Sequence, residues 1–143
     1  MAVVDFSLTR RFPYAGGQKF GDTGAYEQID ALVTFAVDPL AEVNRDIVDL
    51  EYAPRDNEGR VRFTADFSLV TPTDPNKGSH SLLIELPNRG RRTVIGTYNR
   101  TSEDPSASPS PGDGFLFERG LSVASIGWQW DVYANDVLMG LTP

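Results

Sequence analysis

Two segments in the first half of the chain place apolar residues at every second position, and this pattern constrains the fold more than any other feature. The first segment covers residues 29–37 and the second covers residues 61–69. Successive side chains of a β-strand point to opposite faces of its sheet, so each segment predicts a strand with one buried face. The buried faces are predicted to carry Ile29, Ala31, Val33, Phe35 and Val37 in the first strand and Val61, Phe63, Ala65, Phe67 and Leu69 in the second. The solvated faces are predicted to carry Gln28, Asp30 and Thr34 in the first strand and Arg62, Thr64, Asp66 and Ser68 in the second.

Two shorter strands are also expected in this half. Residues 1–11 alternate through Val4, Phe6 and Leu8, and residues 46–50 form a brief candidate strand before a turn that contains Pro and Gly. Similar turn-forming clusters separate the other segments. The first half therefore predicts an antiparallel sheet with one solvated face.

The pattern changes in the second half. The nearly continuous apolar runs Leu82–Leu86 and 121–127 are typical of strands that are covered on both faces. Between them, the Pro-, Ser- and Gly-rich segment 99–114 predicts a flexible loop, and residues 115–119 predict a short helix. Two strands joined by such a crossover form a parallel βαβ unit. The sequence thus predicts a single α/β domain over residues 1–143, β-rich overall, in which antiparallel N-terminal strands precede one parallel βαβ unit.

Charge and composition exclude several classes of partner and cofactor. The formal net charge is −7, and an acidic surface repels phosphate backbones and anionic lipids, so neither nucleic acid nor a membrane is an expected partner. The chain has no cysteine and one histidine, which excludes a thiolate nucleophile and leaves too few ligands for a zinc site. No metal or organic cofactor is predicted. No secretion signal and no apolar run of about 20 residues is readable, so a cytoplasmic location is expected.

Several segments carry a resemblance to a known family. They are Phe20–Glu27, Phe35–Pro39, Ala53–Arg55, Glu85–Gly90 and the stretch that runs from Gly112–Leu116 to Gly127–Asp131. With their order of strands and helix, they resemble the N-terminal region of a large bacterial group of alpha/beta hydrolase domain proteins, and the similarity covers almost the whole chain. The resemblance implies a partial α/β-hydrolase-like sheet. It also implies ester hydrolysis, with a small ester-like substrate, in full-length relatives.

The resemblance also suggests a site at the ends of two strands. It makes Leu82–Leu86 the third strand of the hydrolase sheet and Asn88, Arg89 and Gly90 the loop that supplies part of the oxyanion hole. A structural ion pair is the favoured role for the Arg89 side chain itself. Pocket candidates follow the second predicted parallel strand, at the carboxyl end where open α/β sheets bind ligands, although they could equally serve packing alone. These pocket candidates are Trp128, Trp130 and Asp131.

The nucleophile that this chemistry requires is missing. An α/β-hydrolase carries its Ser on a tight Gly-flanked turn from strand to helix. Ser122 lies instead between Gly120 and Ala124 at a helix-to-strand junction, and His80 precedes the third strand at the opposite end from the expected site. We therefore assign no catalytic residue. We expect a chain that stops before the nucleophile and does not hydrolyse esters alone.

Two alternatives to an incomplete hydrolase domain remain open. The chain could be a non-catalytic β-rich binding or assembly module, or one half of a split hydrolase. In the hydrolase sheet the third strand lies between the fourth and the fifth, so a chain that ends after the fourth leaves Leu82–Leu86 at an open edge. Self-association or a complementing chain is expected at that edge.

Overall fold

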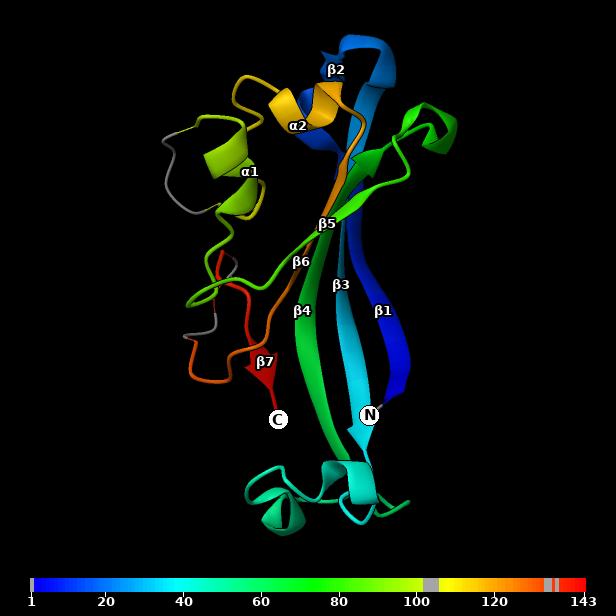
Figure 1. The fold of residues 1–143 in the computed structure, drawn as a ribbon, viewed down its shortest axis with the longest axis vertical. Helices are drawn as coiled ribbons and strands as arrows, with labels where there is room; N and C mark the ends of the chain where they lie inside the picture. Colours follow the sequence, from blue (N-terminus) through cyan, green and yellow to red (C-terminus); the bar gives the residue numbers. More distant parts are fainter. Residues whose placement is uncertain (1, 102–105, 133–134, 136) are drawn as a thin grey trace.

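A mixed sheet of seven strands forms the body of the protein in a computed structural model that describes residues 2–101, 106–132, 135 and 137–143. The strands run in the spatial order β1-β3-β4-β6-β5, while β2 pairs with β3 and β7 pairs with β4 (Figure 1). Their bounds are β1 (Ala2–Pro13), β2 (Lys19–Phe20), β3 (Gly24–Val37), β4 (Val61–Pro72), β5 (Leu82–Glu85), β6 (Ser122–Ile126) and β7 (Leu141–Thr142). The α-helices are α1 (Val94–Tyr98) and α2 (Phe115–Glu118), and the 3-10 turns are η1 (Tyr14–Gly17), η2 (Gly21–Thr23), η3 (Glu42–Asn44), η4 (Leu50–Tyr52) and η5 (Pro75–Lys77).

The sheet changes from antiparallel to parallel pairing, as the sequence predicts. Strands β1, β3 and β4 pair antiparallel along most of their length, and β6 also pairs antiparallel with β4. Strands β5 and β6 are parallel, with Leu83 opposite Val123. The connection between β5 and β6 carries both α-helices, which gives the predicted crossover. The structure is therefore β-rich, with few helices and a partly parallel sheet.

The predicted strand at residues 46–50 is wrong. This stretch belongs to the long connection between β3 and β4, which forms consecutive turns at the end of the molecule opposite β2 (Figure 1). Asp49 has a left-handed backbone with φ 60° and precedes η4, which interrupts any extended conformation. The side chain of Val48 is largely exposed, so no buried face supports a strand here.

Part of the face predicted to be solvated is covered as well. Tyr26, Gln28 and Asp30 of β3 share a face with Ser68 and Val70 of β4, and all five are buried. The core on this face packs β-strand residues against both helices. Its members are Tyr14, Phe20, Tyr26, Val70, Ile95, Leu116, Phe117 and Val123.

Polar side chains tolerate this burial because they bond to one another. Asp30 Oδ1 accepts hydrogen bonds from Gln28 Nε2 at 2.9 Å and from Ser68 Oγ at 2.7 Å. Asp30 Oδ2 accepts one from Arg10 at 2.9 Å. Buried polar groups whose hydrogen bonds are made do not carry the desolvation penalty of unpaired ones. The strand positions were predicted correctly, and Ala31, Val33, Val37, Val61 and Ala65 are buried as predicted. The burial of the polar residues on the opposite face was not predicted.

The opposite face of the sheet, which we call the open face, is apolar and partly exposed. It carries Phe6 and Leu8 of β1, both more than half exposed, beside Phe67 and Leu69 of β4. The rings of Phe6 and Phe67 meet edge to face at 5.5 Å between centroids. The face continues across β6 and β5 through Ile126, Ala124, Ile84 and Leu82.

The predicted helix is present as α2. Its first amide, that of Phe115, donates a hydrogen bond to Asp113 Oδ1 at 3.1 Å, and Gly120 after it has the left-handed φ of 73° expected of a helix stop. The described residues of segment 99–114 form no helix or strand. Asn99 within it is nevertheless fully buried, because its side chain binds the Leu116 amide and the Pro111 carbonyl.

Candidate functional site

The parallel pairing of β5 and β6 brings their following loops together at one end of the sheet. The Arg89 amide donates to Gln129 Oε1 at 2.6 Å, and the Arg89 guanidinium lies 2.7 Å from Asp131 Oδ2. Trp128 Nε1 donates to the Pro87 carbonyl at 2.9 Å. The turn 88–90 and the segment 128–131, which were predicted separately, therefore form one site.

The turn at residues 88–90 has an unusual backbone. Arg89 and Gly90 both have positive φ, at 52° and 75°, and the Arg91 amide closes the turn on the Asn88 carbonyl at 3.1 Å. Gly90 is also approached by another segment, because its carbonyl accepts from the Met139 amide at 2.9 Å. A Cβ atom at Gly90 would lie 2.8 Å from the Met139 carbonyl oxygen. Because Gly90 has no side chain, the backbone of Met139 can lie close to it.

The side chains of this site are mostly solvated. Arg89 and Asp131 are an exposed ion pair, which agrees with the structural role favoured for Arg89 but contributes little stability. Trp128 and Trp130 are both more than half exposed, so neither ring is packed in the core. The segments 87–92 and 127–132 contain no Ser, Cys or His, so the two loops supply no nucleophile of their own.

Ser122 and His80 lie at the other end of the parallel pair. Ser122 is the first residue of β6, and its hydroxyl is 2.8 Å from that of Thr71. His80 precedes β5 and is exposed, with a positive φ of 55°. Both border a shallow apolar groove on the open face, and no hydrogen bond between them occurs among the described residues. Their positions are separated from the turn 88–90 by the length of β5.

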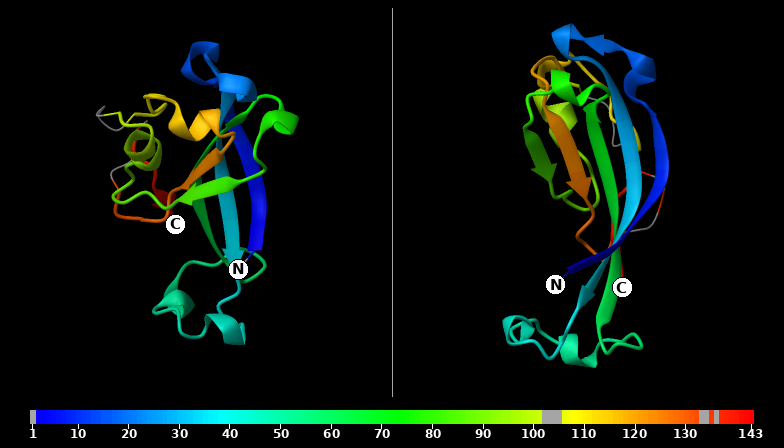
Figure 2. Two further views of the ribbon diagram at one scale, coloured as in Figure 1. Left: turned by 45° about the horizontal axis from the view of Figure 1, so that its top comes forward. Right: turned by 90° about the vertical axis from the view of Figure 1, so that its right-hand side faces the viewer.

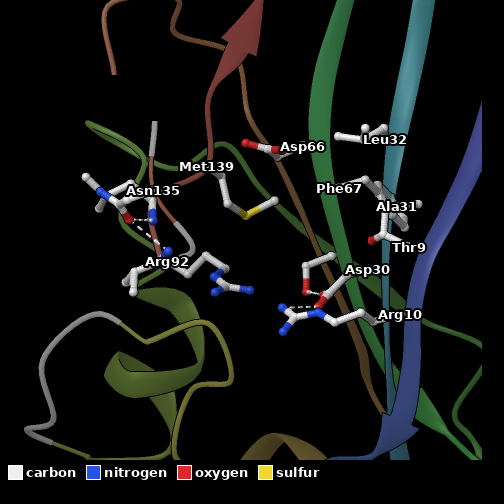
Figure 3. Close-up of a pocket in the computed structure, with 13 residues that line it drawn as sticks. Thr9, Arg10, Asp30, Ala31, Leu32, Asp66, Phe67, Arg92, Asn135 and Met139 are labelled. Atoms are coloured by element: carbon white, nitrogen blue, oxygen red, sulfur yellow. Dashed lines mark hydrogen bonds and ion pairs between the residues drawn. The ribbon is translucent and has the colours of Figure 1, made fainter. Parts of the chain in front are cut away.

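The structure contains a cavity that the sequence did not predict. It has a volume of about 440 Å³ and lies on the covered face, beside β1, β3, β4 and the C-terminal segment (Figure 3). Its charged and polar lining comes from Arg10, Asp30, Asp66, Ser68 and Arg92. Arg92 extends toward Arg10 and Asp30 from the other side of the space (Figure 3).

Arg92 is the least satisfied charge of this cavity. One terminal nitrogen of its guanidinium donates to the Ser106 carbonyl at 2.5 Å, while its buried Nε has no hydrogen-bond partner among the residues that the structure describes. Desolvation lowers the pKa of Arg92, and the nearby carboxylates Asp30, Glu85 and Asp66 act in the opposite direction. The only signal in the sequence was the cluster Arg89, Arg91 and Arg92, which does not show that the last of these points inward.

Three comparisons with known proteins found nothing similar to this chain: no family model, no curated protein and no solved structure matches it. No helix of the described residues has both the length and the apolar character needed to cross a membrane.

Proposed function

We propose that this chain provides the N-terminal strands and the oxyanion loop of an α/β-hydrolase-like ester hydrolase, and that it is not catalytic alone. The strand order is the observation that carries the proposal. β6 lies between β4 and β5, is antiparallel to the first and parallel to the second, and β5 is left at the edge. This is the order expected if β5 and β6 are the third and fourth strands of the hydrolase sheet.

The turn 88–90 supports the same proposal. It follows β5 directly, at the carboxyl end of the parallel strands, where a hydrolase places one donor of its oxyanion hole. The Arg89 amide is already directed at a side-chain oxygen, that of Gln129. Displacement of the Gln129 amide group would leave the Arg89 N–H available to a developing oxyanion.

The absence of a strand-to-helix Ser turn explains why the chain would not act alone. The sequence contains no Gly-x-Ser-x-Gly, and Ser122 lies at the amino end of its strand. A nucleophile and its His and acid partners would have to come from elsewhere, as in a full-length relative or a split enzyme. The substrate class would be a small ester.

A chimera tests this proposal directly. We expect residues 1–143, joined to the nucleophile-bearing C-terminal part of a full-length protein of the resembled family, to hydrolyse a short-chain chromogenic ester. The purified chain alone should neither turn over the ester nor react with a fluorophosphonate probe, and Ser122→Ala should change nothing. Turnover by the chain alone that Ser122→Ala abolishes would overturn the proposal, as would a folded chimera without activity.

A non-catalytic binding or assembly module is the second candidate. The observation that favours it is the open face, which is apolar across the sheet and has exposed side chains at both edges, Phe6 and Leu8 on β1 and Leu82 and Ile84 on β5. Contiguous apolar surface of this kind is typical of interaction sites. An inactive chimera together with stable association of the chain would favour this candidate.

A further inference from the structure

Strand β5 has an edge that no other described strand covers. It is the last strand of the sheet order and pairs only with β6 (Figure 2). The Ser122 amide donates to the Ser81 carbonyl at 3.0 Å. Because alternate residues of a parallel strand direct both backbone groups to the same neighbour, Leu83 faces β6, and Leu82 and Ile84 direct their N–H and C=O groups outward.

Strand β5 is short, but it contains neither a bulge nor a proline, two features that usually prevent pairing at an edge. Natural edge strands carry charged residues, prolines or bulges. The other edge of the sheet, β1, has two register shifts and includes Asp5, Arg10 and Arg11. β5 pairs without a shift, and its one charged residue, Glu85, is turned inward and buried.

The outward side chains of β5 are apolar. Leu82, Ile84 and Leu86 are 54%, 59% and 63% exposed. Leu82 and Ile84 border the apolar groove of the open face, which also touches Phe67 and Ile126. The edge therefore combines free backbone groups with an apolar border.

We propose that β5 pairs with β5 of a second copy of this chain, antiparallel, across a two-fold axis at Ile84. In this register Ile84 faces Ile84 of the other copy and Leu82 faces its Leu86, so the pairs on the open face are apolar, while Leu83 faces Glu85 on the other face of the sheet. Ile84 directs both backbone groups outward, so the central pair exchanges two hydrogen bonds. A two-fold axis uses the same surface on both copies and leaves no β5 edge open.

Charge restricts the surfaces at which two copies can approach. Each copy carries a net charge of −7, so two copies repel one another at most surfaces. The outward surface of β5 is uncharged, which makes it a segment where two acidic copies approach without facing carboxylates. A strongly charged partner would find no opposite charge on the strand. The open faces of the two copies also join into one surface across the new pair.

Sedimentation velocity over a concentration series tests the pairing. We expect the wild-type chain to dimerise and Ile84→Lys to raise the dissociation constant at least tenfold, because two ammonium groups then face each other across the axis. Leu8→Lys is the matched control, because Leu8 is 58% exposed on the same face but lies on the β1 edge. It should dimerise like the wild type. Circular dichroism establishes that each variant is folded.

A cysteine at the axis tests the register. The chain has no cysteine of its own, and facing residues of a hydrogen-bonded antiparallel pair have Cα atoms about 5.5 Å apart, within the range of a disulfide. Oxidation should link Ile84→Cys into a covalent dimer and leave Leu8→Cys monomeric. A monomeric wild type at about 100 μM, the highest concentration of the series, or a dimer insensitive to Ile84→Lys, would overturn the proposal. It does not depend on the hydrolase assignment, since none of these readouts involves ester turnover.

Discussion

Glu85 links the parallel strands to helix α1, and its removal is the perturbation whose effect is best defined by the structure. Its Oε1 accepts hydrogen bonds from the amides of Thr93 and Val94 at 2.6 and 3.0 Å. Its Oε2 accepts one from the Ser125 hydroxyl at 3.0 Å. The side chain thus joins β5, β6 and the first turn of α1, directly before the turn that carries the proposed oxyanion donor.

The magnitude follows from the groups that lose a partner. Glu85→Ala leaves the amides of Thr93 and Val94 and the hydroxyls of Thr93 and Ser125 without their acceptor, and a buried unsatisfied group costs about 1–3 kcal/mol. We expect the free energy of unfolding to fall by about 4 kcal/mol, a large fraction of the roughly 5–15 kcal/mol of a typical domain. Glu85→Gln keeps an acceptor for both amides but loses the charge, so a loss of about 1–2 kcal/mol is expected. Ser125→Ala removes one donor and should cost about 1 kcal/mol.

Urea denaturation followed by tryptophan fluorescence measures this series. The expected order of stability is wild type, Ser125→Ala, Glu85→Gln and then Glu85→Ala. The order matters more than any single value, because each variant removes a defined subset of the same contacts. If Glu85→Ala lost less than about 1 kcal/mol, the carboxylate would not be the link between strands and helix that its hydrogen bonds indicate.

Three further predictions concern other parts of the fold. Gly90→Ala should lower the free energy of unfolding by about 3 kcal/mol in thermal melts, because φ is positive and the new Cβ meets the Met139 carbonyl. The control Gly59→Ala should cost about 1 kcal/mol, because Gly59 has a similar φ of 77° but no atom within 4 Å of the new Cβ. Equal losses would refute the close approach of Met139 to Gly90. Tyr26→Phe should cost about 1–2 kcal/mol in urea, because the buried hydroxyl lies within hydrogen-bonding distance of the carbonyls of Phe117 and Leu121. Hydrogen bonds from Arg62 and from the Arg60 amide lower the pKa of Asp56 from 3.8 to about 2. The stabilising contribution of the Asp56 carboxylate is therefore complete above pH 3.8 and is lost as the pH falls toward 2. The urea midpoints of the wild type and Asp56→Asn should differ near pH 6 and converge near pH 2. A difference that stays constant with pH would contradict this prediction.

Local pattern was sufficient to locate most strands. The alternation at residues 29–37 and 61–69 lies within β3 and β4, and the run Leu82–Leu86 contains β5. The change from antiparallel to parallel pairing also followed from the sequence, because a crossover with a helix joins parallel strands. The strand predicted at residues 46–50 was wrong because a short apolar stretch is also compatible with turns. Asp49 in this stretch has the left-handed backbone of a turn.

The site was predictable in its parts but not as an arrangement. The turn 88–90 and the residues Trp128, Trp130 and Asp131 were each expected at the carboxyl end of a strand. The contact between Arg89 and Asp131 joins positions 42 residues apart, and the close approach of Met139 to Gly90 joins a further segment. The cavity beside Arg92 depends on four segments that only the folded chain brings together.

The sequence by itself determined where the chain is extended, where it turns and where its pairing becomes parallel, because these depend on periodicities within one segment. The tertiary structure alone decided that polar residues on the second face of the sheet are buried too. Gln28, Asp30 and Ser68 are polar and were predicted to be solvated, yet Gln28 Nε2, Asp30 Oδ1 and Ser68 Oγ bond to one another once β3 and β4 pair. Burial of a polar side chain depends on partners that are distant in sequence, so the alternation of apolar and polar residues cannot reveal it.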